Sequence, residues 1–209
     1  CSAGEPIDPN LPAFSKTQLD SLRQALAAAP QDALPRFDAS PLDRALEDGS
    51  ENAIRRAALA LSEQLAKAHL HGCTAAAKRS EWYIKDSDDS AALRSKIDQA
   101  LLDEAKFESF FAGLNPAPPE YAALRSAYNA ETDPARRLTL ARNMERWRWL
   151  PRELGPNHVL VNVPAFEVYL RRSGEAEQTW RAVVGKKATP TPQLAASITA
   201  VQPASTARH

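Results

Sequence analysis

The chain has 209 residues, 44% of them apolar, so it is long enough to bury a hydrophobic core and suits one domain plus part of a second. Its 26 basic and 26 acidic residues cancel, which removes the broad electrostatic attraction that draws basic proteins to nucleic acids and anionic membranes. No apolar run approaches the roughly 20 residues that a membrane-spanning helix needs. We therefore expect no nucleic-acid partner and no transmembrane segment.

The sequence begins at a cysteine, Cys1, and continues through a proline-containing stretch that we interpret as a tether over residues 1–14. A first-position cysteine with Ser2 behind it looks like a bacterial lipoprotein after removal of its signal peptide, in which case Cys1 carries the lipid. The alternative is an arbitrary boundary of the sequence. The other cysteine, Cys73, is expected to be a free thiol.

Up to about residue 150 the apolar residues recur at spacings of three and four, which is typical of helices that bury one face. Ser15, Ser40 and Ser50 stand where helices should begin, and Pro30 and Gly49 stand where they should end. Further helical windows cover residues 90–105, 105–112, 118–128 and 133–149. The pattern predicts an all-helical domain over residues 15–150.

Beyond Pro151 the period changes to two, which is typical of strands. The alternation predicts strands at 159–163, 166–170 and 179–185, with a bend at Pro164 and a turn at Ser173-Gly174. A last short strand is expected at 197–201, and a disordered tail at 203–209. The fold class is therefore α+β, with a mainly helical domain followed by a small, incomplete antiparallel β meander over residues 151–202.

Three motifs follow one another near the helix-to-strand junction. They read NMERWRWLP at Asn143–Pro151, VLVNVPAF at Val159–Phe166, and VVGK with TPTP at 183–186 and 189–192. This succession resembles the scaffold-to-catalytic junction of the large bacterial L,D-transpeptidases, periplasmic enzymes that cross-link peptidoglycan through a cysteine thiolate. A weaker likeness extends into the helical half, at residues 22–30, 61–72 and 110–128.

The resemblance implies a role in peptidoglycan cross-linking without catalysis by this chain itself. In the family the catalytic half is only beginning where this sequence reaches His209, so the chain is expected to be the scaffold portion of an L,D-transpeptidase-like protein, truncated before its catalytic motif and inactive alone. Many relatives also insert a small peptidoglycan-binding module between the equivalents of Tyr128 and Asp133, and only a few residues stand there.

The expected location is the periplasm, with a tether to the outer membrane if Cys1 is lipidated. The expected partners are peptidoglycan or a separate transpeptidase catalytic domain, and no cofactor is implied. The alternative function, from a different class, is a helical periplasmic lipoprotein that acts as an interaction module.

One segment, His69–Cys73, partly matches the Ser-His-Gly-Cys-x-Arg catalytic motif of that family. It has Leu70 in place of the serine and Ala75 in place of the arginine, and it precedes the strands instead of following them. A nucleophilic thiol also needs a lowered pKa and a positioned base, which a helix end does not supply by itself. We therefore interpret Gly72 as a helix stop and assign no catalytic residue.

No metal site is predicted. His69 and His71 are two positions apart and would point to different faces of a helix, whereas helical ligand pairs are three or four apart. The carboxylates of Asp86, Asp88 and Asp89 are reminiscent of a calcium loop, but the required glycine and terminal glutamate are missing. A solvated loop is the preferred interpretation.

Two tryptophans, Trp147 and Trp149, alternate with Arg146 and Arg148 just before Pro151. An aromatic and basic surface of this kind could bind a sugar or a peptide. The spacing favours packing instead, because the helical period places Trp147 in an apolar stripe. We therefore predict a structural junction made by Trp147, Trp149 and Pro151.

Overall fold

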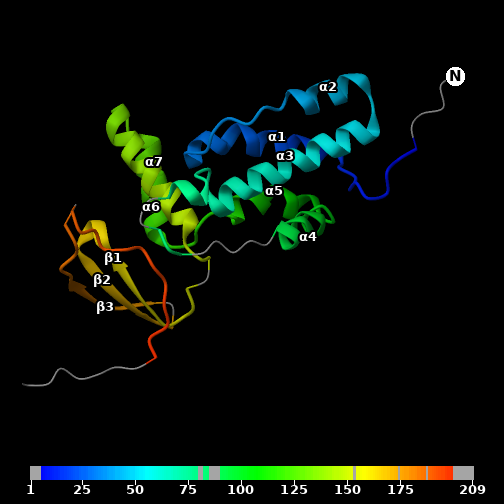
Figure 1. The fold of residues 1–209 in the computed structure, drawn as a ribbon. Coiled ribbons are helices and arrows are strands. Elements are labelled where there is room, and N and C mark those ends of the chain that lie inside the picture. The colour runs from blue at the N-terminus through cyan, green and yellow to red at the C-terminus, as the bar shows by residue number, and fades with distance from the viewer. Residues whose placement is uncertain are drawn as a thin grey trace, which may run out of the picture. The chain divides into compact units, whose positions relative to one another are not determined.

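The computed structural model describes residues 6–79, 82–84, 90–152, 154–173, 175–186 and 188–199. Figure 1 shows its elements. The α-helices are α1 (Lys16–Ala28), α2 (Ser40–Asp48), α3 (Glu51–His71), α4 (Ser90–Ala100), α5 (Glu104–Gly113), α6 (Pro119–Ala130) and α7 (Pro134–Trp149). Short 3-10 helices are η1 (Ala29–Asp32), η2 (Ala76–Lys78) and η3 (Val163–Ala165), and the strands are β1 (His158–Asn162), β2 (Glu167–Arg172) and β3 (Glu175–Arg181).

The predicted α+β fold class, mainly helical with a small antiparallel sheet, is confirmed. Local capping chemistry explains the helix boundaries. Ser15 and Gln18 form a reciprocal capping box at the start of α1, and the Ser50 hydroxyl accepts a hydrogen bond from the first turn of α3. Gly49 takes the left-handed conformation that ends α2, and Gly72 is the C-cap of α3 as expected. No described helix is both long and apolar enough to span a bilayer.

The strands depart from the prediction at three places. β3 begins at residue 175 rather than at 179, because the chain turns at Ser173, whose φ is +54°, and a register shift follows Leu170. The expected bend at Pro164 is the 3-10 helix η3. No strand forms over residues 197–199, the described part of the expected last strand, while the tail at 203–209 lies outside the described residues.

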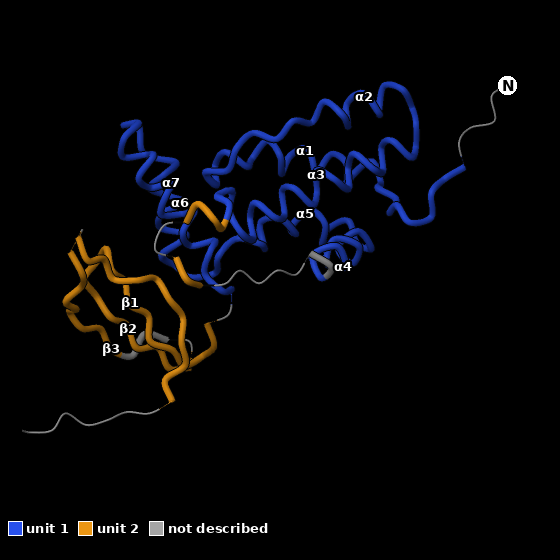
Figure 2. The backbone as a smooth tube through the Cα atoms, viewed as in Figure 1, with its two compact units in different colours: residues 1–75, 86–153 blue, residues 76–85, 154–209 orange. Residues whose placement is uncertain are grey.

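The chain divides into two compact units, coloured separately in Figure 2. The helical unit comprises residues 1–75 and 86–153, and the sheet unit comprises residues 76–85 and 154–209. The expected boundary near residue 150 is therefore close, but the single domain expected over 15–150 loses residues 76–85 to the sheet unit. Those residues join it because Trp82 forms a β-bridge with Gln193, and the Tyr83 amide donates to the Gln193 carbonyl at 2.8 Å.

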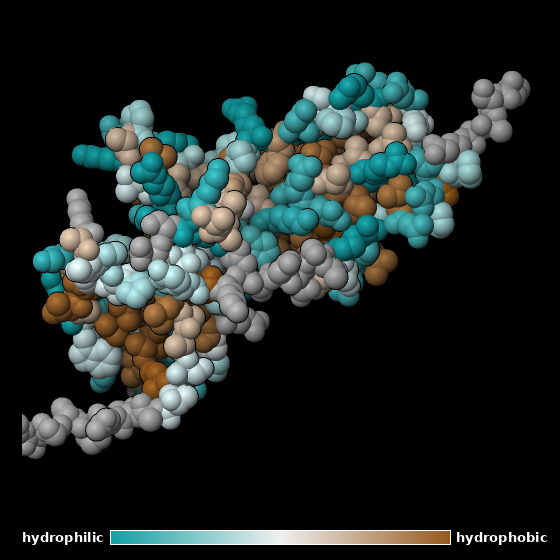
Figure 3. Space-filling model, viewed as in Figure 1, coloured by the Kyte–Doolittle hydropathy of each residue, from teal (hydrophilic) through white to brown (hydrophobic). Residues whose placement is uncertain are grey.

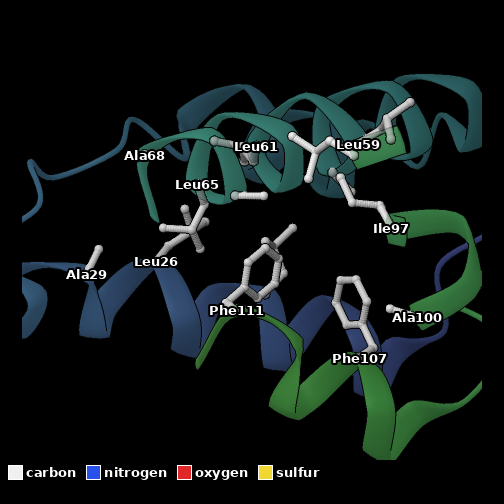
Figure 4. Packing of buried hydrophobic residues seen from close by; sticks show 14 of the residues in the cluster. Leu26, Ala29, Leu59, Leu61, Leu65, Ala68, Ile97, Ala100, Phe107 and Phe111 are labelled. Atoms are coloured by element: carbon white, nitrogen blue, oxygen red, sulfur yellow. The ribbon is translucent and has the colours of Figure 1, made fainter. Parts of the chain in front are cut away.

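The helical unit has a closed hydrophobic core. Figure 4 shows aliphatic side chains of α3 facing aromatic side chains of α5. Leu65 and Phe107 are fully buried, and Phe107 packs edge-on against Phe111 with ring centroids 5.6 Å apart. Because α1, α3, α4 and α5 all contribute to one buried cluster, this unit has what an independently stable domain needs.

The N-terminal segment is not a free tether over its described part, residues 6–14. Leu11 and Phe14 pack against the core of the helical unit. The side chain of Asn52 accepts a hydrogen bond from the Asp8 amide at 2.9 Å and donates one to the Pro6 carbonyl at 2.8 Å. Within the expected tether over residues 1–14, the described residues 6–14 are therefore fastened to the helical unit by apolar side chains and by Asn52 of α3.

The sheet unit has an order β1-β2-β3, with both pairs antiparallel. Between β1 and β2, Val159 lies opposite Leu170 and Val161 lies opposite Val168. Between β2 and β3, Val168 lies opposite Trp180. Directly opposite residues share a face, so these five apolar side chains line one side of the sheet. We call this side the apolar sheet face.

The apolar sheet face is partly exposed. Val159, Val161 and Trp180 are 44%, 45% and 47% exposed, and no apolar side chain in the described part of the sheet unit is fully buried. Figure 3 shows apolar residues at the surface of this unit. A three-stranded sheet depends on packing of its apolar face for stability, and the described part of this unit provides no buried apolar core.

Candidate functional site

The end of α3 is closed by a carboxylate from α7. Gly72 has φ +73°, and its backbone turns so that the Cys73 and Thr74 amides both donate to Glu145 Oε1, each at 2.7 Å. Trp149 Nε1 donates to the same oxygen at 3.2 Å. A glycine is favoured here because L side chains rarely adopt φ of +73°, and a Cβ atom at residue 72 would also lie 2.4 Å from Glu145 Oε1, so the carboxylate would have to shift. The His-Gly-Cys segment is thus a carboxylate-capped helix end.

A second carboxylate, that of Asp32 at the end of η1, is buried where α6 passes over it. Arg125 Nε donates to Asp32 Oδ1 at 2.6 Å, and Asn115 Nδ2 donates to the same oxygen at 3.3 Å. The Asp32 side chain is 8% exposed and that of Arg125 is 40% exposed. This ion pair therefore ties the α1 end of the unit to α6, with its carboxylate buried and its guanidinium partly exposed to water.

The hydrogen bonds around Asp32 run in one direction. A carboxylate that takes part as an ion-pair partner only accepts, so the Asn115 amide group must point its NH₂ at Asp32 and its oxygen away from it. Asn115 Oδ1 then accepts from Tyr121 OH at 3.2 Å and lies 3.0 Å from His69 Nδ1. His69 Nδ1 must therefore carry a hydrogen, which leaves Nε2 as the unprotonated nitrogen of the neutral ring.

Two guanidinium groups complete the arrangement. Arg148 on α7 is 1% exposed, and its Nη2 donates to Tyr121 OH at 2.8 Å and to the Asp32 carbonyl oxygen. Arg152 Nη2 donates to the Leu70 carbonyl at 3.0 Å and to the His69 carbonyl, so it closes the last turn of α3. We call the eight residues concerned the buried polar cluster: Asp32, His69, Asn115, Tyr121, Arg125, Glu145, Arg148 and Arg152.

The buried polar cluster is short of acceptors. Among the described residues, Nε of Arg148 and both Nε and Nη1 of Arg152 are buried without a hydrogen-bond partner. Burial lowers the pKa of Arg152 to about 10. The positive charge of Arg148 also lowers this pKa, whereas Tyr121 raises it. Three guanidiniums face two carboxylates within the cluster, so the site holds a surplus positive charge.

The thiol of Cys73 is not set up for nucleophilic chemistry. Desolvation, and then the negative charge of Glu145, raise the pKa of this thiol above its ordinary value, and the opposing charge of Arg148 is the smaller influence. A reactive cysteine needs the opposite shift. The cysteine is free, as expected, and the neighbouring His69 ring is turned toward Asn115. This geometry supports the interpretation of the segment as a helix end.

The predicted structural junction is only partly as expected. Trp147 and Trp149 are half-buried, neither belongs to the hydrophobic cluster, and Pro151 is exposed. The residues that α7 buries are Met144 and Arg148. The prediction that Trp147 is a core residue was wrong. Met144 and Arg148, which are four residues apart, define the inward face of α7, and Trp147 lies beside that face. Trp149 does take part in the junction through its bond to Glu145.

The motifs of the sheet unit form β1, η3 and a tight turn. Asn162 Oδ1 accepts from the Ala165 amide, and Phe166 follows in the left-handed conformation with φ +58°. In the turn, the Gly185 amide donates to Thr191 Oγ1 at 2.7 Å, and a Cβ atom on Gly185 would lie 2.1 Å from the Thr189 carbonyl oxygen. The glycine of the VVGK motif is thus required by close backbone approach.

Three other predicted features stand as follows. Within the described ranges, no three His, Cys, Asp or Glu side chains are grouped so that they could hold a metal ion. The expected solvated loop with Asp86, Asp88 and Asp89 lies outside the described residues, and so does Cys1. Lipid attachment at Cys1 therefore stays a prediction.

Sequence reasoning missed most of the buried polar cluster. Asp32, Asn115, Tyr121 and Arg125 gave no signal, because each looks like an ordinary helix-end or surface residue. The available signal was the arginine at position 148, which stands four residues after Met144 on the same helical face. An arginine on an apolar face indicates a buried partner.

Comparison of the chain with protein-family profiles and with curated proteins finds no match to either.

Proposed function

We propose that this chain is the non-catalytic scaffold portion of an L,D-transpeptidase-like protein that takes part in peptidoglycan cross-linking. The proposal rests on the resemblance of the three junction motifs, and the observation that carries it furthest is the contrast between the two units. The helical unit has a closed core, whereas the sheet unit exposes an apolar face. A scaffold followed by the beginning of a β-domain has this asymmetry.

The chemistry of the described residues agrees with a non-catalytic role. The single segment with the letters of the catalytic motif is used to end α3, and its thiol has a raised pKa. Both features work against attack by a thiolate. The partner expected under this proposal is a separate catalytic β-domain, whose sheet would cover the apolar sheet face, and the expected location is the periplasm.

The test combines activity with assembly. The purified chain, incubated with tetrapeptide muropeptides, should yield no cross-linked dimers. Adding L,D-transpeptidase catalytic domains encoded in the same genome should give a complex with one of them by analytical ultracentrifugation, and cross-linking should rise above that of the catalytic domain alone. A Cys73→Ala variant should behave identically in the mixture. Dimers formed by the chain alone and lost in Cys73→Ala would refute the proposal, and so would the absence of any complex.

The second candidate is a helical lipoprotein that acts as an interaction module. The specific observation in its favour is the closed helical core, which needs no catalytic domain to be stable. Under this proposal a fragment of residues 6–75 linked to 86–153 would retain partner binding. Under the first proposal the strands are needed, so that fragment would not bind the catalytic domain.

A further inference from the structure

The buried polar cluster contains one group that can change charge near neutral pH. His69 is 3% exposed, in the last turn of α3. Its Nδ1–H is already committed to Asn115 Oδ1 at 3.0 Å. Acid must therefore protonate Nε2, and the ring then becomes a buried cation.

The surroundings of His69 disfavour its protonated, positively charged form. The charged groups that face His69 are Asp32 from η1, Arg148 from α7, and Arg152, which follows α7. The remaining titratable members of the cluster are Tyr121 and Arg125 on α6 and Glu145 on α7. Asp32 already accepts from Arg125 and Asn115. In the part of the chain that the structure describes, Nε of Arg148 and Nε and Nη1 of Arg152 are buried N–H groups without a hydrogen-bond partner, so a further positive charge beside them would be poorly compensated.

We propose that His69 is a proton-operated latch: protonation of its Nε2 loosens the packing of the α3 end against α6 and α7. The loosened contacts include the bonds of Arg152 to the His69 and Leu70 carbonyls and the carboxylate cap that Glu145 places on Cys73 and Thr74. These contacts hold the last residues of the helical unit, so acid weakens the anchoring of the segment that leads into the strands. The proposal stands whether or not the chain serves transpeptidation.

The direction of the pH dependence follows from linkage. Burial is the main influence that lowers the pKa of His69 from 6.5, with Arg148 and Arg152 adding to it, and the Asn115 bond and Asp32 oppose it. The opened or unfolded chain then binds a proton more readily than the closed state. The closed state keeps its full stability above pH 6.5 and loses it as the pH falls toward the lowered value. For one proton, the open population rises by at most about tenfold per pH unit.

The experiment measures titration and opening separately. In the full chain with isotope-labelled histidines, the ring of His69 should titrate below 6.5 by NMR. Hydrogen exchange, corrected for its intrinsic pH dependence, should show amides of residues 66–74 opening several-fold more often at pH 5.0 than at pH 7.5. Amides around Leu22 in α1 should not change.

The matched variants are His69→Asn and His71→Asn. Asparagine keeps a donor near the Nδ1 position but does not titrate, so His69→Asn should lose the acid-induced opening, whereas His71→Asn should keep it. Equal acid opening in His69→Asn and the wild type would overturn the proposal. A His69 titration at or above 6.5 in the wild type would also overturn it, and this second measurement decides the matter even if His69→Asn fails to fold.

Discussion

Replacing Asp32 by alanine should destabilise the helical unit strongly. The substitution removes the oxygen that accepts from Arg125 Nε at 2.6 Å and from Asn115 Nδ2 at 3.3 Å. Hydrogen bonds to a charged group contribute about 1.5–3 kcal/mol each, and a buried donor left without a partner costs about 1–3 kcal/mol. Because Arg125 is 40% exposed and can turn to water, we take the lower part of that range, about 3 kcal/mol in total.

The assay is urea denaturation followed by circular dichroism. With a slope of about 2–3 kcal/mol per molar urea, a loss of about 3 kcal/mol lowers the midpoint by about 1–1.5 M. The matched control is Asp43→Ala, which removes an ion pair to Arg23 whose two side chains are 45% and 49% exposed. Such a surface pair contributes about 0–1 kcal/mol. If the two variants shift the midpoint equally, the reasoning about the buried polar cluster is wrong.

Gly72→Ala should destabilise the chain by about 1–3 kcal/mol more than Gly49→Ala in the same assay. Both glycines have positive φ, but only a Cβ atom at residue 72 would lie against Glu145. Equal losses of stability would contradict this prediction. Cys73 should react with iodoacetamide at pH 7 more slowly than free cysteine and form no stable carbapenem adduct by intact mass, and Glu145→Gln should speed the alkylation by removing a charge that raises the thiol pKa. Trp147→Ala should cost about 1–2 kcal/mol, less than the 2–5 kcal/mol expected for the fully buried Leu65→Ala, and a reversed order would show that the tryptophan is a core residue after all.

The helices could be predicted from sequence because their boundaries depend on nearby residues. Ser15 with Gln18, and Ser50 before α3, satisfy backbone donors within three positions, and Gly49 supplies the left-handed residue that ends α2. The switch from a period of three to four to a period of two located the start of the sheet, but it placed β3 four residues too late and predicted a last strand that does not form over residues 197–199.

The buried polar cluster could not be predicted because its partners are far apart in the chain. Arg148 bonds to the carbonyl of Asp32, which is 116 residues earlier. The assignment of residues 76–85 to the sheet unit depends on the bridge between Trp82 and Gln193. The turn at Ser173 was expected, but the register shift between Leu170 and Arg171 depends on the pairing of β2 with β3, which alternation alone does not place.

The most direct test of the proposed scaffold role is hydrogen exchange of the chain alone and in the presence of its catalytic β-domain. Alone, amides of β1, β2 and β3 should exchange at least about 100-fold faster than those around Leu65 and Phe107, because the described part of the sheet unit has no fully buried apolar side chain whereas the helical unit has a closed core. Binding of the catalytic domain should slow exchange in the strands and leave the helical core unchanged. Strands as protected as the helical core in the isolated chain, or strands unaffected by the catalytic domain, would contradict the account.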